Sequence, residues 1–317
     1  MQWRFSMKQL IESEVEYFAI SELVQQLYTF IPGLSISPDV DSYPDSGYSF
    51  QPSPSYGLPG KRNSYSQVIL EDILEDSINR LNSAIPQQYR KDAFKQVLSI
   101  SSQQLIDTNE SFHKLLIEGV PIINQSYDQG REERAMLIDF LDYRNNIYNI
   151  VNQFTIHEDN YQKQPDIIIF INGIPLIVLV LKKNESANDK LREAYDTFLD
   201  FKTTIPSLFY YNAFCIISDG FEAKIGTISS TFSRFHLWKY IAGFIEPFSC
   251  VNQLELIIKG LLDRETLLDV IRNFIGFEKS ERINPGTGLK KQKNVKRIAS
   301  YYQYYKANKT CGRIQIL

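Results

Sequence analysis

The segment PDIIIFINGIPLIVLVLKK, residues 165–183, limits the fold more than any other part of the chain. It holds two short apolar runs, 166–171 and 175–182, which are rich in isoleucine and valine and apolar at consecutive positions. Such runs are typical of strands that are buried on both faces of a sheet. Between the runs, Asn172 and Gly173 favour a two-residue hairpin turn. We therefore expect an antiparallel hairpin of buried, central strands.

Apolar residues at helical spacing lie on both sides of this hairpin in the sequence. The spacing predicts helices over 8–30, 64–82 (with Ser64 as N-cap), 87–99, 109–118, 188–202 and 253–277. Short runs of strand-forming residues predict further strands over 134–140, 148–156 and 210–220. Helices, antiparallel strands, a helix and a strand in this order indicate an α/β fold with a mixed sheet flanked by helices. The last predicted helix adds a helical C-terminal extension.

A proline-rich segment separates the first two predicted helices. Residues 33–64 hold five of the thirteen prolines together with many Ser, Gly and Tyr residues, a composition that predicts a loop. We therefore divide the chain into an N-terminal helix and loop (1–64), a central domain (65–240), and a helical segment with a basic linker (241–317).

The composition favours a globular protein of a reducing compartment. Hydrophobic residues make up 43% of the 317 positions and aromatic residues 13%, enough for a sizeable core. No apolar run approaches the roughly 20 residues that a membrane span needs, and no signal core follows the N-terminus. The three cysteines form no CxxC pair, which argues against a zinc site or a disulfide framework. We expect a cytoplasmic protein without a membrane partner.

The charges are unevenly distributed. The net charge is −3, yet residues 279–317 hold ten Lys or Arg residues and one acid. A basic tail of +9 on a body of −12 is one of two things: an electrostatic footprint for phosphate groups, or a solvated linker.

The ends of the predicted hairpin carry residues suited to phosphodiester chemistry. Asp166 opens the first strand and Lys182 closes the second. Hydrolysis with Mg²⁺ typically uses one or two carboxylates to hold the ion and a lysine to orient water or neutralise charge. A second acid is expected at position 180, which shares a face of its strand with position 182. Val180 stands there and cannot bind a metal. By themselves, one acid and one lysine beside a hairpin are a weak signal, because strand-end lysines are usually solvated.

Several segments together resemble the restriction (R) subunit of type I restriction-modification enzymes. The resemblance rests on PDIIIFINGIPLIVLVLKK and IVNQF (150–154), and it continues through SYSQVILEDIL, FHKLLIEGVPI, YYNAFCIISDGFEAKIGTISS and RFHLWK. Downstream it includes LELIIKGLLDRETLLDVIRNFIGFE and RIASYYQYYKANK. It thus covers almost the whole chain, and agreement of so many segments in order is far more specific than the hairpin alone.

The resemblance implies a nuclease domain of the PD-(D/E)xK type, with a mixed sheet flanked by helices and Mg²⁺ as its cofactor. In this family an ATP-driven, helicase-like motor follows the nuclease domain. The R subunit joins methyltransferase and specificity subunits, which recognise the DNA target. The motor draws DNA in, and the nuclease cuts it at a distance.

The family's site residues carry over only in part. Asp166 matches the first metal-binding acid and Lys182 the lysine, while Val180 replaces the second acid. A Gln-x-x-x-Tyr signature on the following helix aligns with Thr197 and Phe201, so that the site is degenerate at three positions.

The family's ATP site is represented by a remnant. Gln303 matches the glutamine that contacts adenine at the start of the motor. A GxxxxGK[ST] phosphate loop is absent from the sequence, so this chain alone is no ATP motor. We expect a chain truncated before the motor.

One residue could replace the missing acid. Glu193 lies one helical turn before Thr197 and shares a face of the 188–202 helix with it; Asp196 and Asp200 are less well aligned. Glu71 on the earlier helix either approaches the site or is an exposed charge near the helix start. The alternative is that Glu193 is a solvated helix acid. The scattered His113, His157 and His236 are expected to be structural or surface residues without a catalytic role. The tyrosines at 301, 302, 304 and 305 either stack on bases or pack against the motor.

Three hypotheses follow. The chain is an R-subunit fragment whose nuclease site has decayed, an active Mg²⁺-dependent DNA endonuclease with a relocated acid, or a non-catalytic module for subunit assembly.

Overall fold

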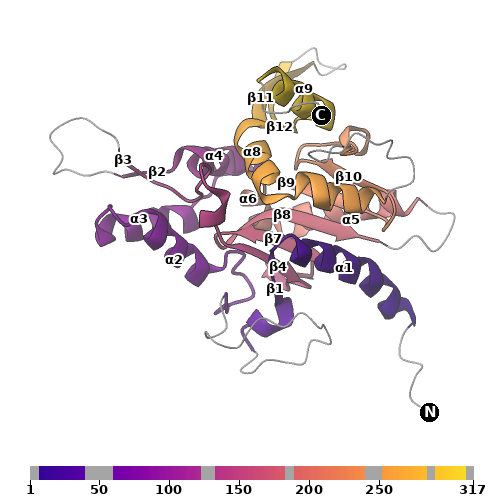
Figure 1. The fold of residues 1–317 in the computed structure, drawn as a ribbon, viewed down its shortest axis with the longest axis horizontal. Coiled ribbons are helices and arrows are strands. Elements are labelled where there is room, and N and C mark those ends of the chain that lie inside the picture. Colours follow the sequence, from indigo (N-terminus) through magenta and orange to yellow (C-terminus); the bar gives the residue numbers. More distant parts are fainter. Residues whose placement is uncertain are drawn as a thin grey trace.

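A computed structural model describes residues 7–39, 60–122, 133–182, 189–239, 252–283 and 290–311, with the backbone alone at 7–13, 280–283 and 290–293. A mixed sheet lies at the centre and helices flank it (Figure 1). The predicted α/β class with a mixed sheet is confirmed. Most of the predicted 33–64 loop lies outside the described residues, as does Cys250.

The helices flanking the sheet are α1 (Met7–Gln25), α2 (Glu71–Leu81), α3 (Gln87–Leu98), α4 (Leu105–Glu118), α5 (Lys190–Thr204), α6 (Pro206–Tyr210), α7 (Gln253–Leu256), α8 (Arg264–Asn273) and α9 (Tyr301–Thr310). A π-helical turn, Ile257–Leu261, continues α7. Among the described residues, no helix combines the length and apolar character that crossing a bilayer requires.

Six strands form the central sheet in the order β1-β4-β7-β8-β9-β10. They are β1 (Thr29–Pro32), β4 (Tyr148–Asn152), β7 (Ile167–Ile171), β8 (Ile174–Leu181), β9 (Phe214–Ser218) and β10 (Ala223–Gly226). Pairing is parallel for β1–β4 and β8–β9 and antiparallel for the others. Small two-stranded sheets pair β2 (Val120–Ile122) with β3 (Glu133–Ala135), and β5 (Ile156–Glu158) with β6 (Tyr161–Lys163).

The predicted central hairpin is β7–β8, and every residue of both strands is buried. Asn172 and Gly173 form its turn with positive φ angles of 51° and 79°. The turn is itself enclosed: Asn172 Nδ2 donates to the Leu137 carbonyl at 2.9 Å, and its Oδ1 accepts from the Ile147 amide at 2.8 Å. The Leu70 amide donates to the Gly173 carbonyl at 2.9 Å, which fixes the start of α2 on the turn.

The first predicted helix is too long by five residues. Helical spacing extended it to Phe30, but α1 ends at Gln25, and Leu27 adopts a φ of 67° with 69% of its surface exposed. Phe30 and Ile31 are instead buried in β1, paired with Ile150 and Val151 of β4. These apolar residues also fitted the spacing of a helix, but they form the edge strand of the sheet. At the end of a helix, pairing with a neighbouring strand outweighs local apolar spacing.

The second helix begins six residues later than predicted, counted from N-cap to N-cap. Its N-cap position is occupied by Leu70, not Ser64, and the Ser64 hydroxyl accepts from the Ser66 amide in an exposed turn. Residues 68–70 are buried outside the helix and lead to the Gly173 contact. Local apolar spacing could not distinguish this buried segment, which leads into the helix, from the first turn of the helix itself.

The predicted 253–277 helix is divided. Asp263 caps α8 by accepting from the Thr266 amide at 3.1 Å, which separates α8 from the π-helical turn before it. After Phe274 the chain enters β11 (Ile275–Ile283), which pairs over nine positions with β12 (Lys290–Ile298). We call this pair the ribbon. No strand was predicted here, because its charged residues hide the two-residue period.

Other boundaries differ from the predictions as well. The predicted 134–140 strand retains only the end of β3, and 148–156 contains β4 and the first residue of β5. The predicted 210–220 strand is β9, preceded by α6.

Lys296 fastens the ribbon to the body of the protein. Its side chain is 1% exposed, and its Nζ donates to Asn109 Oδ1 of α4 at 2.8 Å and to the Asn212 carbonyl at 2.7 Å. Its carbonyl accepts from the Thr227 hydroxyl at 2.8 Å. Asn294, two residues before, donates to Asp107 Oδ1 at 2.8 Å. Burial without a carboxylate among these partners lowers the pKa of Lys296 to about 7.

Gly173→Ala is expected to destabilise the fold by more than about 2 kcal/mol. A Cβ there would stand 2.4 Å from the Leu70 carbonyl oxygen and 2.8 Å from the Leu74 nitrogen, both backbone atoms that cannot move aside. Gly276→Ala is the matched control, since a Cβ added there would meet no atom of the described residues within 4 Å. Urea unfolding compares the two. Equal stability of both variants would contradict a close turn contact.

The free energy of unfolding is expected to rise with pH between about 7 and 8.5 because of Lys296. Its folded pKa of about 7 lies below the ordinary lysine value of 10.5, so in this window the unfolded chain holds a proton that the folded chain has released. One such group contributes at most about 1.4 kcal/mol per pH unit. Lys296→Met should flatten the rise. The unfolding free energy of this variant is measured by urea titration at each pH. If it rose with pH as steeply as that of the unaltered protein, the rise would be due to other groups.

Candidate functional site

Asp166, Val180 and Lys182 meet at the open end of the β7–β8 hairpin. The last strand pair at this end is Ile167 with Leu179, so continuing the register places Asp166 opposite Val180. Asp166 and Lys182 are half-buried. The Lys182 amide donates to the Ser218 carbonyl of β9 at 2.8 Å, which holds the end of β8 between two strands. The hairpin thus brings together the three positions that the sequence singled out.

Asp166 is held by backbone groups. Its Oδ2 accepts from the Leu181 amide at 2.8 Å, across the hairpin, and its carbonyl accepts from the Gln153 amide at 3.0 Å. One carboxylate oxygen is therefore committed to closing the end of the hairpin. Asp166 therefore has a structural role in addition to any role in binding a cation.

The IVNQF segment builds the wall next to Asp166. Glu16 of α1 is buried and accepts from Asn152 Nδ2 at 2.7 Å and from Gln153 Nε2 at 2.6 Å. The Gly33 amide donates to Asn152 Oδ1 at 3.3 Å. Gln153 turns the chain with a φ of 47°. The segment thereby ties α1, the end of β1 and the Asp166 backbone together.

Val180 fills the position opposite Asp166 with an apolar side chain. It is 0% exposed and pairs with Ile217 of β9. An unpaired carboxylate would be costly in this enclosed place unless a cation accompanied it. Among the described residues, no three His, Cys, Asp or Glu side chains lie together as a metal-binding group.

The acids of α5 are each engaged in an ion pair on the surface. Glu193 Oε2 lies 2.9 Å from Lys190 Nζ, and Asp200 Oδ2 lies 2.7 Å from Lys163 Nζ. Asp196 pairs with Arg192 at 3.4 Å. Glu71, on α2, accepts from Gln67 Nε2 at 2.7 Å.

Thr197 and Phe201 show what stands at the family's signature positions on α5. The Thr197 hydroxyl donates to the Glu193 carbonyl of the same helix at 3.0 Å. Phe201 is 7% exposed and belongs to the hydrophobic core. Neither side chain offers a charge to the end of the hairpin.

Gln303 serves as part of a helix cap. Its Oε1 accepts from the Ser300 amide at 2.8 Å, while the Ser300 hydroxyl accepts from the Gln303 amide, so that the two residues form a capping box at the start of α9. Gln303 is exposed. The structure thus gives this residue a local role beside the adenine contact that the family implies.

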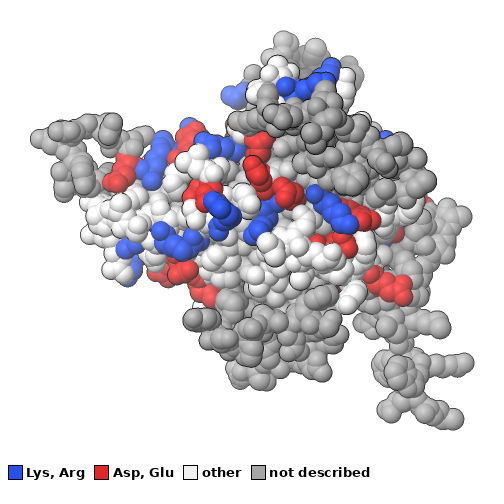
Figure 2. Space-filling view, viewed as in Figure 1, with Lys and Arg blue, Asp and Glu red and all other residues white. Residues whose placement is uncertain are grey.

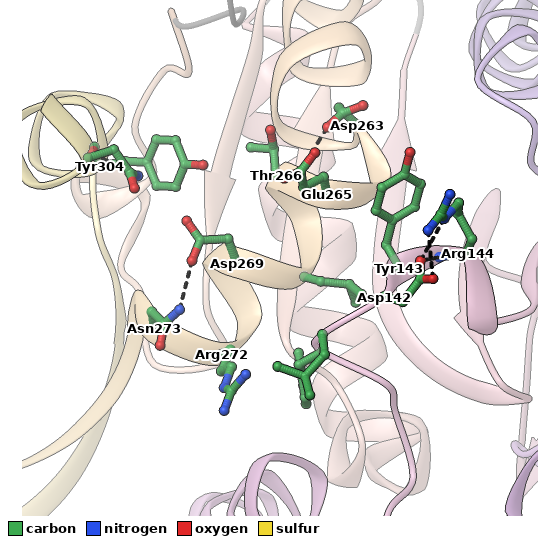
Figure 3. A pocket seen from close by; sticks show the side chains of 14 residues that line it. Asp142, Tyr143, Arg144, Asp263, Glu265, Thr266, Asp269, Arg272, Asn273 and Tyr304 are labelled. Atoms are coloured by element: carbon green, nitrogen blue, oxygen red, sulfur yellow. Dashed lines mark hydrogen bonds and ion pairs between the residues drawn. The ribbon is translucent and has the colours of Figure 1, made fainter. Parts of the chain in front are cut away.

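A hollow of about 880 Å³ lies between the 140–144 segment, α8 and α9, and none of the candidate nuclease residues lines it (Figure 3). Two pairs of its polar groups are engaged with one another: Asp142 with Arg144 at 2.8 Å, and Asp269 with Asn273 at 2.7 Å. Asp263 is the cap of α8.

The three histidines occupy separate places. Burial lowers the pKa of His113 to about 3, and the nearby Lys296 acts in the same direction. The His157 ring stacks on Tyr65 at 4.4 Å, and His236 Nε2 lies 3.3 Å from the Ala299 carbonyl. Of the tyrosines on α9, Tyr304 is buried against Phe274 and Trp238, whereas Tyr302 is 53% exposed.

Two buried cations escaped the sequence analysis. Lys296 was counted only as part of the basic tail, although it is enclosed. Arg62 is 1% exposed, donates from Nη1 to the Thr155 carbonyl at 2.7 Å, and lies 3.8 Å from the centre of the Phe154 ring. Burial lowers the pKa of Arg62 to about 10. No local signal marks either residue, because each is buried by segments distant in the sequence.

Asp166→Ala is expected to lower the free energy of unfolding by about 1–2 kcal/mol, since the Leu181 amide loses its acceptor. Asp166→Asn keeps an acceptor oxygen and should cost less than half as much. Thermal unfolding without divalent ions measures both. If Asp166→Ala were as stable as the unaltered protein, the structural role assigned to this carboxylate would be wrong.

Comparison with known proteins agrees with the resemblance seen in the sequence. The family model described as type I restriction enzyme R protein N terminus matches residues 12–234. The HindI endonuclease subunit of Haemophilus influenzae is 33% identical over 250 residues, which cover 78% of this chain and 23% of that protein.

A second relative covers a similar share of the chain. The putative MjaIXP endonuclease subunit of Methanocaldococcus jannaschii is 27% identical over 293 residues, which cover 84% of this chain and 26% of that protein. The chain thus spans about a quarter of the length of these relatives. It belongs to the family of type I restriction enzyme R proteins and corresponds to their N-terminal region.

Proposed function

We propose that this chain is the nuclease-type region of a type I restriction endonuclease subunit whose metal site has become degenerate. In this role it associates with DNA and with methyltransferase and specificity subunits but does not itself cleave DNA. Its sheet then corresponds to the PD-(D/E)xK nuclease fold, with the central domain at 65–240 between the N-terminal segment 1–64 and the extension 241–317.

The observation that carries the proposal is the buried valine that lies opposite Asp166 when the β7–β8 register is continued by one position. The hairpin retains the acid and the lysine in the expected places, yet Val180 is 0% exposed where a second carboxylate would be needed. Asp166 would hold the ion almost alone while one of its oxygens accepts from the Leu181 amide. Metal ions stabilise phosphodiester transition states by several kcal/mol, so the expected loss of rate is on the order of 10²- to 10⁴-fold.

A relocated acid is less well supported. Glu193 would have to leave its ion pair with Lys190 to reach toward the hairpin. The same applies to Asp200, which is paired with Lys163 of β6. Mg²⁺ therefore remains the family's cofactor and not one for which the described residues are suited. ATP would belong to the motor of a complete R subunit, with Gln303 as the matching residue in this chain.

A plasmid-nicking assay with Mg²⁺ or Mn²⁺ tests the proposal. We expect no metal-dependent nicking by the unaltered protein. Asp166→Ala and Lys182→Ala are the matched controls for contaminating nucleases, which neither substitution would affect. Metal-dependent turnover that is lost in Lys182→Ala would establish an active endonuclease and overturn the degenerate site.

Val180→Glu gives the complementary readout by calorimetry. It places a second carboxylate opposite Asp166 and is expected to raise the affinity for Mn²⁺ at least about tenfold, provided circular dichroism shows a folded protein. The double variant with Asp166→Ala should lose that gain. Tight Mn²⁺ binding by the unaltered protein would show that another acid already completes the site.

A further inference from the structure

We propose that the hollow between the 140–144 segment, α8 and α9 is a self-association site. Two copies of this chain meet there about a two-fold axis, and Leu141 of each copy enters the hollow of the other. This contact is independent of the proposed function, because the hairpin residues Asp166 and Lys182 take no part in it. Three features carry it: an exposed leucine on a fixed loop, a hollow beside that leucine, and charges of both signs around the hollow.

Leu141 is the most exposed of the large apolar side chains among the described residues, with 92% of its surface open to solvent. Hydrogen bonds fix this position: Asp139 Oδ1 accepts from the Leu141 amide at 2.8 Å and from the Asp142 amide at 3.0 Å. The Asp139 amide donates to Asn146 Oδ1 at 2.9 Å, and that oxygen also accepts from Asn172 Nδ2 of the enclosed hairpin turn at 2.8 Å. Single exposed apolar residues are common on proteins. Leu141 differs because the fold holds it outward directly beside a hollow.

The hollow can receive such a side chain together with its neighbours. Its volume of about 880 Å³ lies in the range of concave binding sites, and Leu141 is one of the residues that line it. Because the leucine and the hollow are adjacent on one face, a half-turn about an axis between them places each leucine over the hollow of the other copy. Such a pair of equivalent contacts is the interface of a C2 dimer, the commonest oligomer.

The charges around the hollow fit the same arrangement. Four acids and two arginines line it, so a polyanion would meet a net negative surface. A partner with a single sign of charge would leave one set of these groups unmatched, whereas a second copy presents both signs. Figure 2 shows acidic and basic side chains close together over the region of α8.

Two-fold symmetry also brings opposite charges together. Arg144 is exposed on the 140–144 side of the hollow, whereas Glu265 and Asp269 come from α8 (Figure 3). After the half-turn, Arg144 of each copy faces the α8 acids of the other. Electrostatic matching of this kind fixes the register of an interface.

Arginines over aromatic rings complete the surface around Leu141. The Arg272 guanidinium lies 5.5 Å from the centre of the Phe140 ring, and that of Arg264 lies 5.5 Å from the centre of the Tyr143 ring. Both rings are half-buried and line the hollow. Aromatic and arginine side chains are enriched at protein–protein interfaces, and these rings give an entering leucine apolar neighbours.

Sedimentation velocity of the full chain in EDTA, over about 1 to 100 μM, tests the proposal. We expect a reversible equilibrium between monomer and dimer. Leu141→Glu should weaken dimerisation at least about tenfold, because it removes the apolar anchor and sets a carboxylate against Glu265 and Asp269 of the other copy. The matched control, Leu34→Glu, places the same charge at another leucine, which is 57% exposed. It should change the dissociation constant less than about twofold.

Charge reversal gives a second readout. Arg144→Glu and Glu265→Arg should each weaken dimerisation. The double variant, in which the two charges have exchanged places, should dimerise more strongly than either single variant. Circular dichroism and thermal unfolding show that each variant is folded, and Leu141→Ala repeats the first test if Leu141→Glu is not.

Three outcomes would overturn the proposal. The first is a protein that stays monomeric over the whole range, which would leave the hollow to a different protein partner. The second is a dimer that the Leu141 variants leave as strong as before. The third is a double variant that recovers nothing relative to the single variants. None of these measurements involves DNA or a divalent ion, so their failure is distinct from failure of the degenerate metal site.

Discussion

The enclosure of β7 and β8 is the constraint on which the rest of the structure depends. Both strands are buried along their whole length, so their backbone groups must be paired on both edges, because no water is there to replace a missing partner. β4 and β9 supply these partners. The turn is enclosed as well, and Asn172 and Gly173 fit it because their positive φ angles match a tight hairpin. The start of α2 and the 137–147 segment are then fixed around that turn.

The same enclosure governs the candidate site at the other end of the hairpin. Register sets Asp166 against position 180, and the covered sheet leaves that position no contact with solvent. A carboxylate there is tolerable only with a cation beside it, whereas valine is stable without one. We propose that valine at position 180 removes the need for a metal ion at this place while the fold is kept. Asp166 remains useful because it accepts from the Leu181 amide.

Lys296 illustrates how burial changes the role of a charged residue. Lys296 belongs by composition to a basic tail, but it is enclosed between β12, α4 and the 211–213 segment and fastens the ribbon to the body. One lysine of the basic tail thus holds the ribbon in place.

The sequence by itself determined the central hairpin, its Asn-Gly turn, the α/β class and the family, because these depend on local patterns and on ordered segments. It also identified Asp166, Val180 and Lys182 as one group, since strand period and turn length fix which residues are neighbours. Only the tertiary structure decided that 29–32 is a strand, that α2 begins at Glu71, and that β11 replaces the end of a predicted helix. Sheet pairing and the burial of Lys296 and Arg62 come from segments distant in the chain, and no local pattern records such contacts.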